Sequence, residues 1–411
     1  MKRFKKISKI KSIPKVYIGI LLMLIFLLFF PEVIVILKDL YRDIFPAAAL
    51  KPTITPILTQ KAPIRGAGPP NYLFGAVSIQ VLDKYVYVTS AVDDVFSIWE
   101  ISNPPFLNQL AIVKGAGEPN YLDGAMSVYV SGNYAYIASY LDDALSIFDV
   151  SDPSNPIHLS SIRGAGEPNY LDGAISVYAS GKYAYVASAY DNALSIFDVS
   201  DPSSPIHIGT IKGAGAPNYL EGAKSVYVSG NYAYIASYLD DALSIFDVSN
   251  PPFFFDLSKS SSYPSHLGTI KGAGAPNYLG GAMSVYVADK YAYVASAYDD
   301  ALSIFDISDP SNPVHISSIK GAGGLNYLDG AISVYVSGKY AFVASAYDDA
   351  LSVFDVSNPS NPIHLISIVG AGEPNYLDGV MSVYVADKYI FVASYDDNAI
   401  SLFDLEELMA K

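Results

Sequence analysis

Short runs of Val, Ile, Tyr and Phe alternate with clusters of Gly, Asn, Asp, Ser and Pro along most of this 411-residue chain. One representative stretch holds four such runs, at residues 126–130, 134–139, 144–149 and 157–162. Runs of this length and composition, bounded by turn-forming residues, predict β-strands. None shows a 3.6-residue period over a helical length, so the pattern predicts an all-β domain.

The four-run pattern recurs at a fixed interval. Each copy opens on Gly-Ala-Gly-x-Pro-Asn-Tyr-Leu-x-Gly-Ala, with small departures in the last two copies, and its first glycines are 49 residues apart except for one interval of 59. These glycines are Gly66, Gly115, Gly164, Gly213, Gly272, Gly321 and Gly370. A repeat of this length indicates a solenoid, a propeller or an array.

Both faces of the predicted strands are apolar: Val128 and Tyr129 are adjacent and bulky, as are Ile147 and Phe148. A sheet covered on both sides by neighbouring sheets has this composition. Four strands in a unit of 40–50 residues predict one blade of a β-propeller. Seven copies therefore predict a seven-bladed β-propeller with four-stranded blades.

The two ends of the chain are complementary. The seventh copy supplies three strands and ends at Lys411 without a fourth. Residues 57–65 resemble residues 157–163, a fourth strand, and lead directly into Gly66. We expect this N-terminal strand to complete the last blade, which closes the ring and leaves no free pairing edge. The propeller is thus expected over residues 57–411.

Two phrases carry a family resemblance. Residues 132–138 (Gly-Asn-Tyr-Ala-Tyr-Ile-Ala) and 144–156 (Ala-Leu-Ser-Ile-Phe-Asp-Val-Ser-Asp-Pro-Ser-Asn-Pro) resemble the LVIVD repeat of bacterial and archaeal surface proteins, and similar phrases recur in all seven copies. The resemblance implies a β-propeller but no particular activity, and it carries no catalytic residues. The long Gly-Ala-Gly-x-Pro-Asn-Tyr-Leu insertion is a departure from that repeat.

The N-terminus has a different composition. Residues 1–15 hold seven Lys or Arg and no acid, and residues 16–37 are apolar apart from Pro31 and Glu32. About 20 apolar residues are enough to cross a bilayer. The pattern predicts a basic cytoplasmic segment (1–15), a transmembrane signal anchor (16–37) and a linker (38–56), which place the propeller outside the cell membrane.

A cleaved signal peptide is the alternative, and it would give a secreted protein. Its cleavage site should follow the apolar run closely, whereas the only cluster of small residues, Ala47–Ala49, lies well downstream of Phe30. We therefore favour the uncleaved anchor.

Charge and composition exclude several classes of function. The formal net charge is −15 although the N-terminus is basic, so a nucleic-acid partner is not expected. Thiol chemistry is excluded because there is no cysteine. The chain also lacks nucleophile-elbow, phosphate-loop and zinc-protease motifs, and strict repetition leaves no unique constellation, so an enzyme is not expected.

The repeated loops supply candidate ligand contacts. Asn and Tyr side chains combine hydrogen-bonding groups with a flat apolar surface, which suits a glycan or a peptide. The alternative is that the loops fold on themselves, with Asn ending a turn. The candidates are Asn71, Tyr72, Asn120, Tyr121, Asn169, Tyr170, Asn218, Tyr219, Asn277, Tyr278, Asn326, Tyr327, Asn375 and Tyr376.

Paired aspartates between the second and third strands of a blade should lie on the same face as these loops. Calcium takes six to eight oxygen ligands, which an Asp pair and loop carbonyls could supply. Asp also favours tight turns without any metal. The candidate calcium ligands, the only cofactor considered, are Asp142, Asp143, Asp240, Asp241, Asp299, Asp300, Asp348 and Asp349.

Two further groups of residues repeat or stand out in the sequence. Histidines occupy one outer-strand position in five copies (His158, His207, His266, His315, His364), and a metal site there is not expected because equivalent outer positions lie far apart. The interval of 59 residues adds Phe253, Phe254 and Phe255, which could contact the membrane interface or cover a neighbouring blade.

These observations lead to two functional hypotheses. The first is a membrane-anchored, extracytoplasmic propeller that binds a glycan, peptide or protein partner through an acidic face carrying the Asn-Tyr loops. The alternative is a structural cell-envelope spacer with no soluble ligand.

Overall fold

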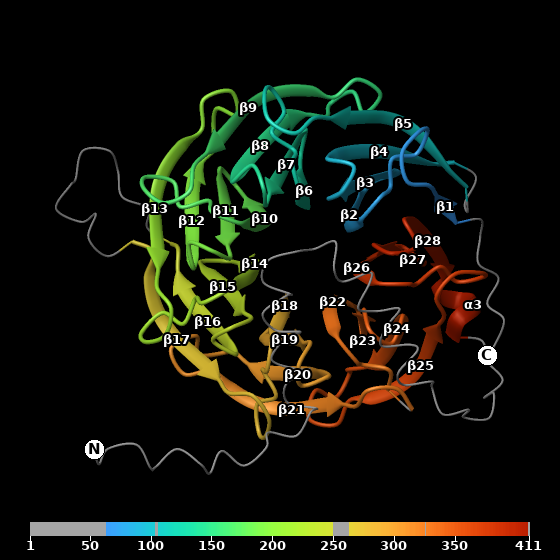
Figure 1. Cartoon of the computed structure of the whole chain (residues 1–411). Helices are drawn as coiled ribbons and strands as arrows, with labels where there is room; N and C mark the ends of the chain where they lie inside the picture. Colours follow the sequence, from blue (N-terminus) through green and yellow to red (C-terminus); the bar gives the residue numbers. More distant parts are fainter. Residues whose placement is uncertain (1–62, 103–105, 250–262, 325, 410–411) are drawn as a thin grey trace, which may run out of the picture. The chain divides into compact units, whose positions relative to one another are not determined.

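The computed structural model describes residues 63–102, 106–249, 263–324 and 326–409, which belong to one compact unit, Pro56–Lys411. In this unit seven four-stranded antiparallel sheets form a ring (Figure 1). The prediction of an all-β, seven-bladed propeller with four-stranded blades is confirmed. The predicted transmembrane segment and Phe253–Phe255 lie outside the described residues, within which no helix is long and apolar enough to span a membrane.

Each blade begins with an inner strand that contacts the inner strands of both neighbouring blades. The inner strands are β2 (Ala76–Leu82), β6 (Ala125–Ser131), β10 (Ala174–Ser180), β14 (Ala223–Ser229), β18 (Ala282–Ala288), β22 (Ala331–Ser337) and β26 (Val380–Ala386). The second strands are β3 (Tyr85–Ser90), β7 (Tyr134–Ser139), β11 (Tyr183–Ser188), β15 (Tyr232–Ser237), β19 (Tyr291–Ser296), β23 (Tyr340–Ser345) and β27 (Tyr389–Ser394).

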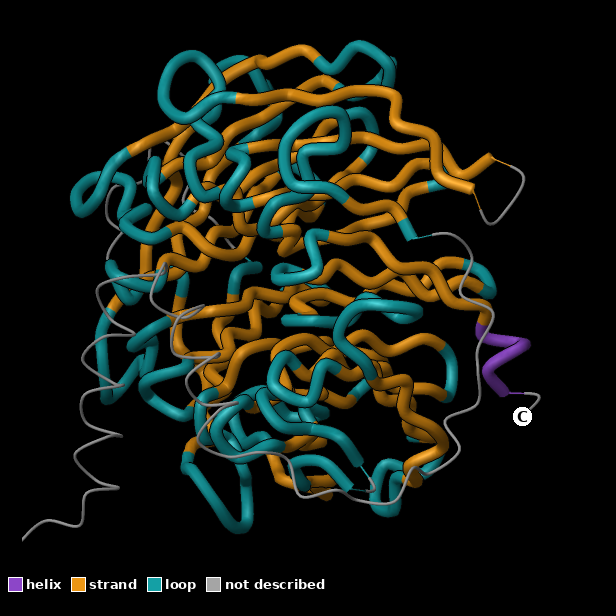
Figure 2. Tube along the Cα trace, turned by 45° about the vertical axis from the view of Figure 1, so that its right-hand side comes forward, coloured by secondary structure: helices purple, strands orange, loops and turns teal. Residues whose placement is uncertain are grey.

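The third strands are β4 (Val95–Ser102), β8 (Ala144–Asp149), β12 (Ala193–Asp198), β16 (Ala242–Asp247), β20 (Ala301–Asp306), β24 (Ala350–Asp355) and β28 (Ala399–Asp404). The outer strands are β5 (Phe106–Lys114), β9 (Ile157–Arg163), β13 (Ile206–Lys212), β17 (Ser265–Lys271), β21 (Val314–Lys320), β25 (Ile363–Val369) and β1 (Ile64–Arg65). A short helix, α3 (Leu405–Met409), follows β28 (Figure 2).

The ring is closed by the N-terminal strand, as the sequence predicts. Strand β1 pairs with β28, in the register Ile64 to Ile400 and Arg65 to Ala399. The remaining residues of the predicted closing strand, 57–62, lie outside the described part. Ile64 also packs against the apolar cluster that joins the last blade to the first.

The core lies between blades. In the described residues, seven clusters of buried side chains each join two adjacent blades. Phe148 of one blade packs in this way with Ile98 of the preceding blade, and both are fully buried. This burial explains why the strands are apolar on both faces, since each sheet has a neighbour on either side.

Candidate functional site

One face of the ring carries all seven repeated loops and the turns between second and third strands; we call it the loop face. The loops comprise residues 66–75, 115–124, 164–173, 213–222, 272–281, 321–324 with 326–330, and 370–379. Each loop is anchored by a leucine with no exposed surface, such as Leu122, whose N–H donates to the Gly115 carbonyl. The loops are therefore built structures that pack onto the blades.

The predicted Asn contacts are used inside the loops. All seven Asn side chains donate from Nδ2 to the backbone carbonyl six residues earlier, at 2.6–3.0 Å, as Asn120 does to Lys114. This geometry favours the interpretation that Asn shapes the loop. A direct role of these amides in ligand binding stays a prediction.

The tyrosines next to them have positive φ angles of 48–51°, a conformation that side-chain-bearing residues seldom adopt. Six of the seven rings lie beneath a cation from the end of their own blade's outer strand, at 3.8–4.6 Å from ion to ring centroid. The pairs are Tyr72–Lys114, Tyr121–Arg163, Tyr170–Lys212, Tyr219–Lys271, Tyr278–Lys320 and Tyr376–Arg65. Tyr327 lacks this partner because Val369 occupies the position of the cation.

The first Asp of each pair binds the loop of its own blade. Asp142 Oδ2 accepts the Gly117 N–H at 3.0 Å and the Asp123 N–H at 2.8 Å. The equivalent residues, Asp93, Asp191, Asp240, Asp299, Asp348 and Asp397, accept the corresponding two amides in their own blades. A buried loop amide without an acceptor costs free energy, so these carboxylates stabilise the loop conformation.

The second residue of each pair binds the loop of the next blade. Asp143 Oδ1 accepts the Gly173 N–H at 3.0 Å, and the same bond recurs around the whole ring. Two of the seven acceptors are amides, Asn192 and Asn398. Asn398 completes the circle by accepting the N–H of Gly75 in the first blade.

The calcium hypothesis gains no support from this geometry. All eight candidate carboxylates accept backbone N–H groups, and two blades substitute neutral Asn for the second Asp. Within the described ranges, no group of three or more His, Cys, Asp or Glu residues is arranged to hold a metal ion. The pairs act as hydrogen-bond acceptors that join the loops of adjacent blades.

A third carboxyl group approaches several of these pairs. Burial, together with nearby Asp300 and Asp348, raises the pKa of Asp329 to about 6. Burial likewise raises the pKa values of Asp123 and Asp172, reinforced by the neighbouring carboxylates. The loop face thus concentrates carboxyl groups that repel one another when ionised.

This repulsion makes stability depend on pH. The folded state binds a proton at Asp329 more tightly than the unfolded state, whose ordinary pKa is 3.8, so stability should fall as pH rises from about 4 to about 6. Asp329→Asn removes the charge and should therefore stabilise the protein by about 1 kcal/mol at pH 7, after allowance for partial exposure. Thermal melts at pH 4–7 measure this, with exposed Asp289→Asn on the opposite face as the matched control. A variant whose pH profile still equals the wild type's would contradict it.

Large apolar side chains are exposed on the inner rim of the loop face. They occupy the second position after the second strand of each blade, and their exposed fractions are 40–63 %. We call them the inner rim: Val92, Leu141, Tyr190, Leu239, Tyr298 and Tyr347, with Asp396 in the seventh blade. Each lies against the glycine that precedes an inner strand, as Leu141 does against Gly124. The glycine repeats in every blade whereas the rim side chain varies.

Polar and aromatic side chains connect adjacent inner strands around the ring axis. In six places a serine hydroxyl accepts a backbone N–H of the next inner strand, as Ser127 does from Val177. Six tyrosine rings contact one another in order around the axis, with neighbouring ring centroids 4.4–5.0 Å apart: Tyr129, Tyr178, Tyr227, Tyr286, Tyr335 and Tyr384. Gln80 takes this position in the first blade and bonds both the N–H and the carbonyl of Val130.

The histidines have the structural role expected for them. Each Nε2 lies 2.8 Å from the hydroxyl of a Ser or Thr three residues later. Each ring also packs against the Phe of the neighbouring third strand, as His158 does against Phe148. Burial lowers the pKa of all five, so they stay neutral at physiological pH.

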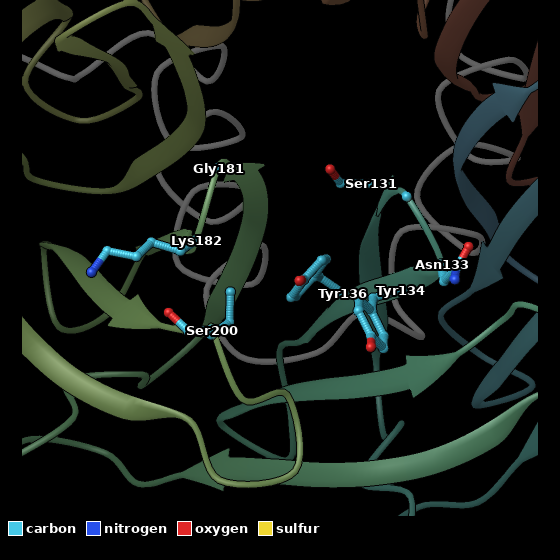
Figure 3. A pocket seen from close by; sticks show the side chains of 9 residues that line it. Ser131, Asn133, Tyr134, Tyr136, Gly181, Lys182 and Ser200 are labelled. Carbon is cyan, nitrogen blue, oxygen red and sulfur yellow. The ribbon is translucent and has the colours of Figure 1, made fainter.

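A shallow depression of about 600 Å³ lies between two blades on the opposite face (Figure 3). Its lining includes Asn133, Tyr134, Tyr136, Lys182 and Ser200. The Lys182 ammonium is already paired with Asp198 at 3.3 Å and lies over the Tyr183 ring. The depression therefore offers no unpaired charge from its lysine and is a weaker candidate site than the loop face.

Comparisons with known proteins agree with this architecture. Residues 124–163, 173–212, 222–253, 279–320 and 330–369 match the LVIVD repeat. The chain is therefore an LVIVD-repeat protein. Four of the five matches end at the last residue of an outer strand. Three of these four begin at the glycine directly before an inner strand, and the fourth begins at Leu279, three residues before one. One LVIVD repeat therefore corresponds to one blade. The first and last blades are not matched, and no curated protein sequence matches the chain.

Similar solved structures establish the fold alone. A putative 6-phosphogluconolactonase from Bacteroides fragilis has a TM-score of 0.59 at 13 % identity, covering 76 % of this chain and 87 % of that one. Virginiamycin B lyase from Staphylococcus aureus has a TM-score of 0.59 at 10 % identity, covering 84 % and 98 %. The computationally designed protein Ika8 has a TM-score of 0.53 at 10 % identity, covering 81 % and 96 %. Identities this low transfer no activity.

Sequence reasoning missed three features of the site. It omitted Asp191–Asn192 and Asp397–Asn398 from the paired residues because they are not Asp-Asp pairs. It also missed the inner rim, although that position varies among copies while its surroundings repeat. The axial tyrosines recur in the Val-Tyr-Val phrase of the inner strands, which is Val-Tyr-Ala at Tyr178, and could have been found by comparing the copies.

Proposed function

We propose that this β-propeller binds a protein partner through the inner rim of its loop face, using a partner segment that combines apolar and basic side chains. The observation that carries the proposal is the exposure of six large apolar side chains at one repeated position. Exposed apolar side chains gathered on one surface are typical of interaction sites, and tyrosine is enriched in them.

The charge of the surrounding residues supports the choice of a basic partner. In five blades an acidic residue directly precedes the glycine that contacts the rim residue: Asp123, Asp172, Glu221, Asp329 and Asp378. The chain as a whole carries a formal charge of −15. Alternating apolar and carboxylate groups complement a segment in which Leu or Phe alternates with Lys or Arg.

Variation at the rim supports specific recognition over a purely structural role. A spacer requires equivalent surfaces, and most loop-face positions are indeed identical among blades. The rim positions hold one Val, two Leu, three Tyr and one Asp, so the contact changes around the ring while the surrounding loop stays the same. We also propose, from the basic and apolar pattern of residues 1–37, that the propeller is displayed outside a cell membrane; resistance of the full chain to carbonate extraction tests the attachment.

A phage-displayed random-peptide library selected on the full-length chain tests the binding site. We expect enriched peptides to contain apolar and basic residues, and to lose at least about tenfold in affinity for a Leu141→Ser, Leu239→Ser, Tyr347→Ser variant. The matched control changes three exposed outer-strand residues instead, Ile157→Ser, Ile206→Ser and Val314→Ser. The proposal fails if no peptide is enriched or if both triple variants bind the peptides equally.

A further inference from the structure

One position on the inner strands breaks the sevenfold repetition in charge. The second residues of the inner strands occupy equivalent places around the ring axis, on the side of the loop face; we call them the axial collar. They are Val77, Met126, Ile175, Lys224, Met283, Ile332 and Met381. Six are uncharged and apolar, and the seventh is a lysine.

The local structure leaves six of these seven side chains partly exposed; Val77 is buried, and Ile332 also packs against the apolar cluster between the last two blades. The pairing of the first two strands shifts register at this position, so Met126 is an extra residue without a cross-strand partner. Lys224 lies at the same irregularity, between Ala223 and Ser225. The residues directly before the bulge, such as Ala125 and Ala223, are fully buried. The partly exposed residues at the bulge position are Met126, Ile175, Lys224, Met283, Ile332 and Met381.

The other nine described lysines have one of two repeated roles. Five form an ion pair with a carboxylate near the end of a third strand: Lys84, Lys182, Lys290, Lys339 and Lys388. Lys114, Lys212, Lys271 and Lys320 lie over a loop tyrosine. Lys224 has neither role, and no carboxylate in the described segments is within ion-pair distance of its ammonium.

The contacts of Lys224 are aromatic. Its ammonium lies 5.7 Å from the centroid of the Tyr238 ring, and the Tyr238 hydroxyl donates to the hydroxyl of the inner-rim residue Tyr298. Burial alone lowers the pKa of Lys224 to about 8, which still leaves the amine mostly protonated at neutral pH. Although the Lys224 side chain keeps some exposed surface, its ammonium is largely surrounded by protein, and without a counter-ion that is unfavourable, so a bound anion would stabilise it.

We propose that Lys224 and the axial collar bind a ligand that carries a carboxylate on an apolar body. The ammonium pairs with the carboxylate, and the Met and Ile side chains of the collar contact the apolar part. Two sources share this chemistry: a free aliphatic acid and the C-terminal carboxylate of an apolar peptide. The site adjoins the partner surface proposed above through the Tyr238–Tyr298 hydrogen bond, but it differs from that surface because it depends on the one cation of the collar.

Binding of carboxyl-¹³C octanoate to the full-length chain, followed by NMR, tests the site. We expect saturable binding that weakens about tenfold or more in Lys224→Met, because a hydrogen-bonded charge is lost. Methionine occupies three equivalent positions (Met126, Met283, Met381), so this variant should fold, and a thermal melt checks that it does. Lys212→Met removes the same charge elsewhere on the loop face and should bind octanoate as the wild type does.

Two further arms identify the ligand class and keep the test independent of folding. Octanol should bind far more weakly than octanoate, and N-acetyl-trileucine should be compared as the free acid and the amide to distinguish a peptide terminus. Octanoate should slow acetylation of Lys224 by an activated ester, as read by mass spectrometry, without slowing that of Lys212. Equal binding of octanoate by the wild type and Lys224→Met, or no saturable binding, would overturn the proposal.

Discussion

Asp142→Ala should lower the free energy of unfolding by about 2–4 kcal/mol, because it leaves two loop amides without an acceptor. Asp142 Oδ2 accepts both the Gly117 and Asp123 N–H groups, and both lie in the partly buried base of the loop. Alanine has no acceptor, and the loop that covers this blade would lose its attachment to the turn. Chemical and thermal denaturation of the wild type and the variant measure the difference.

Asp142→Asn is the matched control and should lose less than about 1 kcal/mol, since one amide oxygen can accept the same two hydrogen bonds. The ring itself contains this exchange at the second position of the pair, where Asn192 and Asn398 accept the N–H groups of Gly222 and Gly75. The control also tests the metal hypothesis, because replacing a carboxylate with a neutral amide removes ligand charge and should weaken calcium binding. Equal destabilisation by Ala and Asn, with stabilisation of the wild type by added calcium, would contradict the hydrogen-bond interpretation.

Gly330→Ala should destabilise the protein by about 2–4 kcal/mol, since it combines backbone strain with a steric clash. The φ angle of Gly330 is +65°, and a Cβ atom there would lie 2.6 Å from Cδ2 of Tyr347. The rim tyrosine packs directly on this glycine, so either the loop or the tyrosine must move. Thermal and urea denaturation report the loss.

Two companion variants separate the causes. Gly338→Ala has a similar φ angle of +57° but no atom within 4 Å of the added Cβ, so it should cost only about 1 kcal/mol from strain. Combining Gly330→Ala with Tyr347→Ala removes the clash and should recover most of the difference between the two glycine variants. If Gly330→Ala is no worse than Gly338→Ala, the contact with Tyr347 has no part in fixing the loop.

The blade and the ring closure could be predicted because both depend on local pattern. Short apolar runs between turn residues define strands, and the 49-residue interval defines the blade. The closing strand followed from the likeness of residues 57–65 to residues 157–163, and Ile64 indeed pairs with Ile400. The apolar composition of both strand faces also indicated that the core lies between neighbouring sheets.

The roles of the loop residues could not be predicted in the same way. Asn120 and Asp142 have the chemistry of ligand-binding residues, yet their polar atoms bond backbone groups of the loops. A repeated polar residue satisfies a repeated backbone geometry as readily as a repeated ligand, and the sequence does not distinguish the two. Lys224 was overlooked because a single lysine among 21 in the chain carries no local signal.

The amino-acid sequence by itself determined the strands, the number of blades and the order in which they close, since these follow from periodic burial and from matching ends. Only the tertiary structure decided which side chains remain available to a partner. Asp94 accepts a hydrogen bond from Gly124 of the next blade, whereas Leu141, which packs against Gly124, stays exposed. Lys224 contacts an aromatic ring and pairs with no carboxylate of the described residues. The Asp94–Gly124 bond joins residues that are 30 positions apart on adjacent blades, so it exists only when both blades are in place.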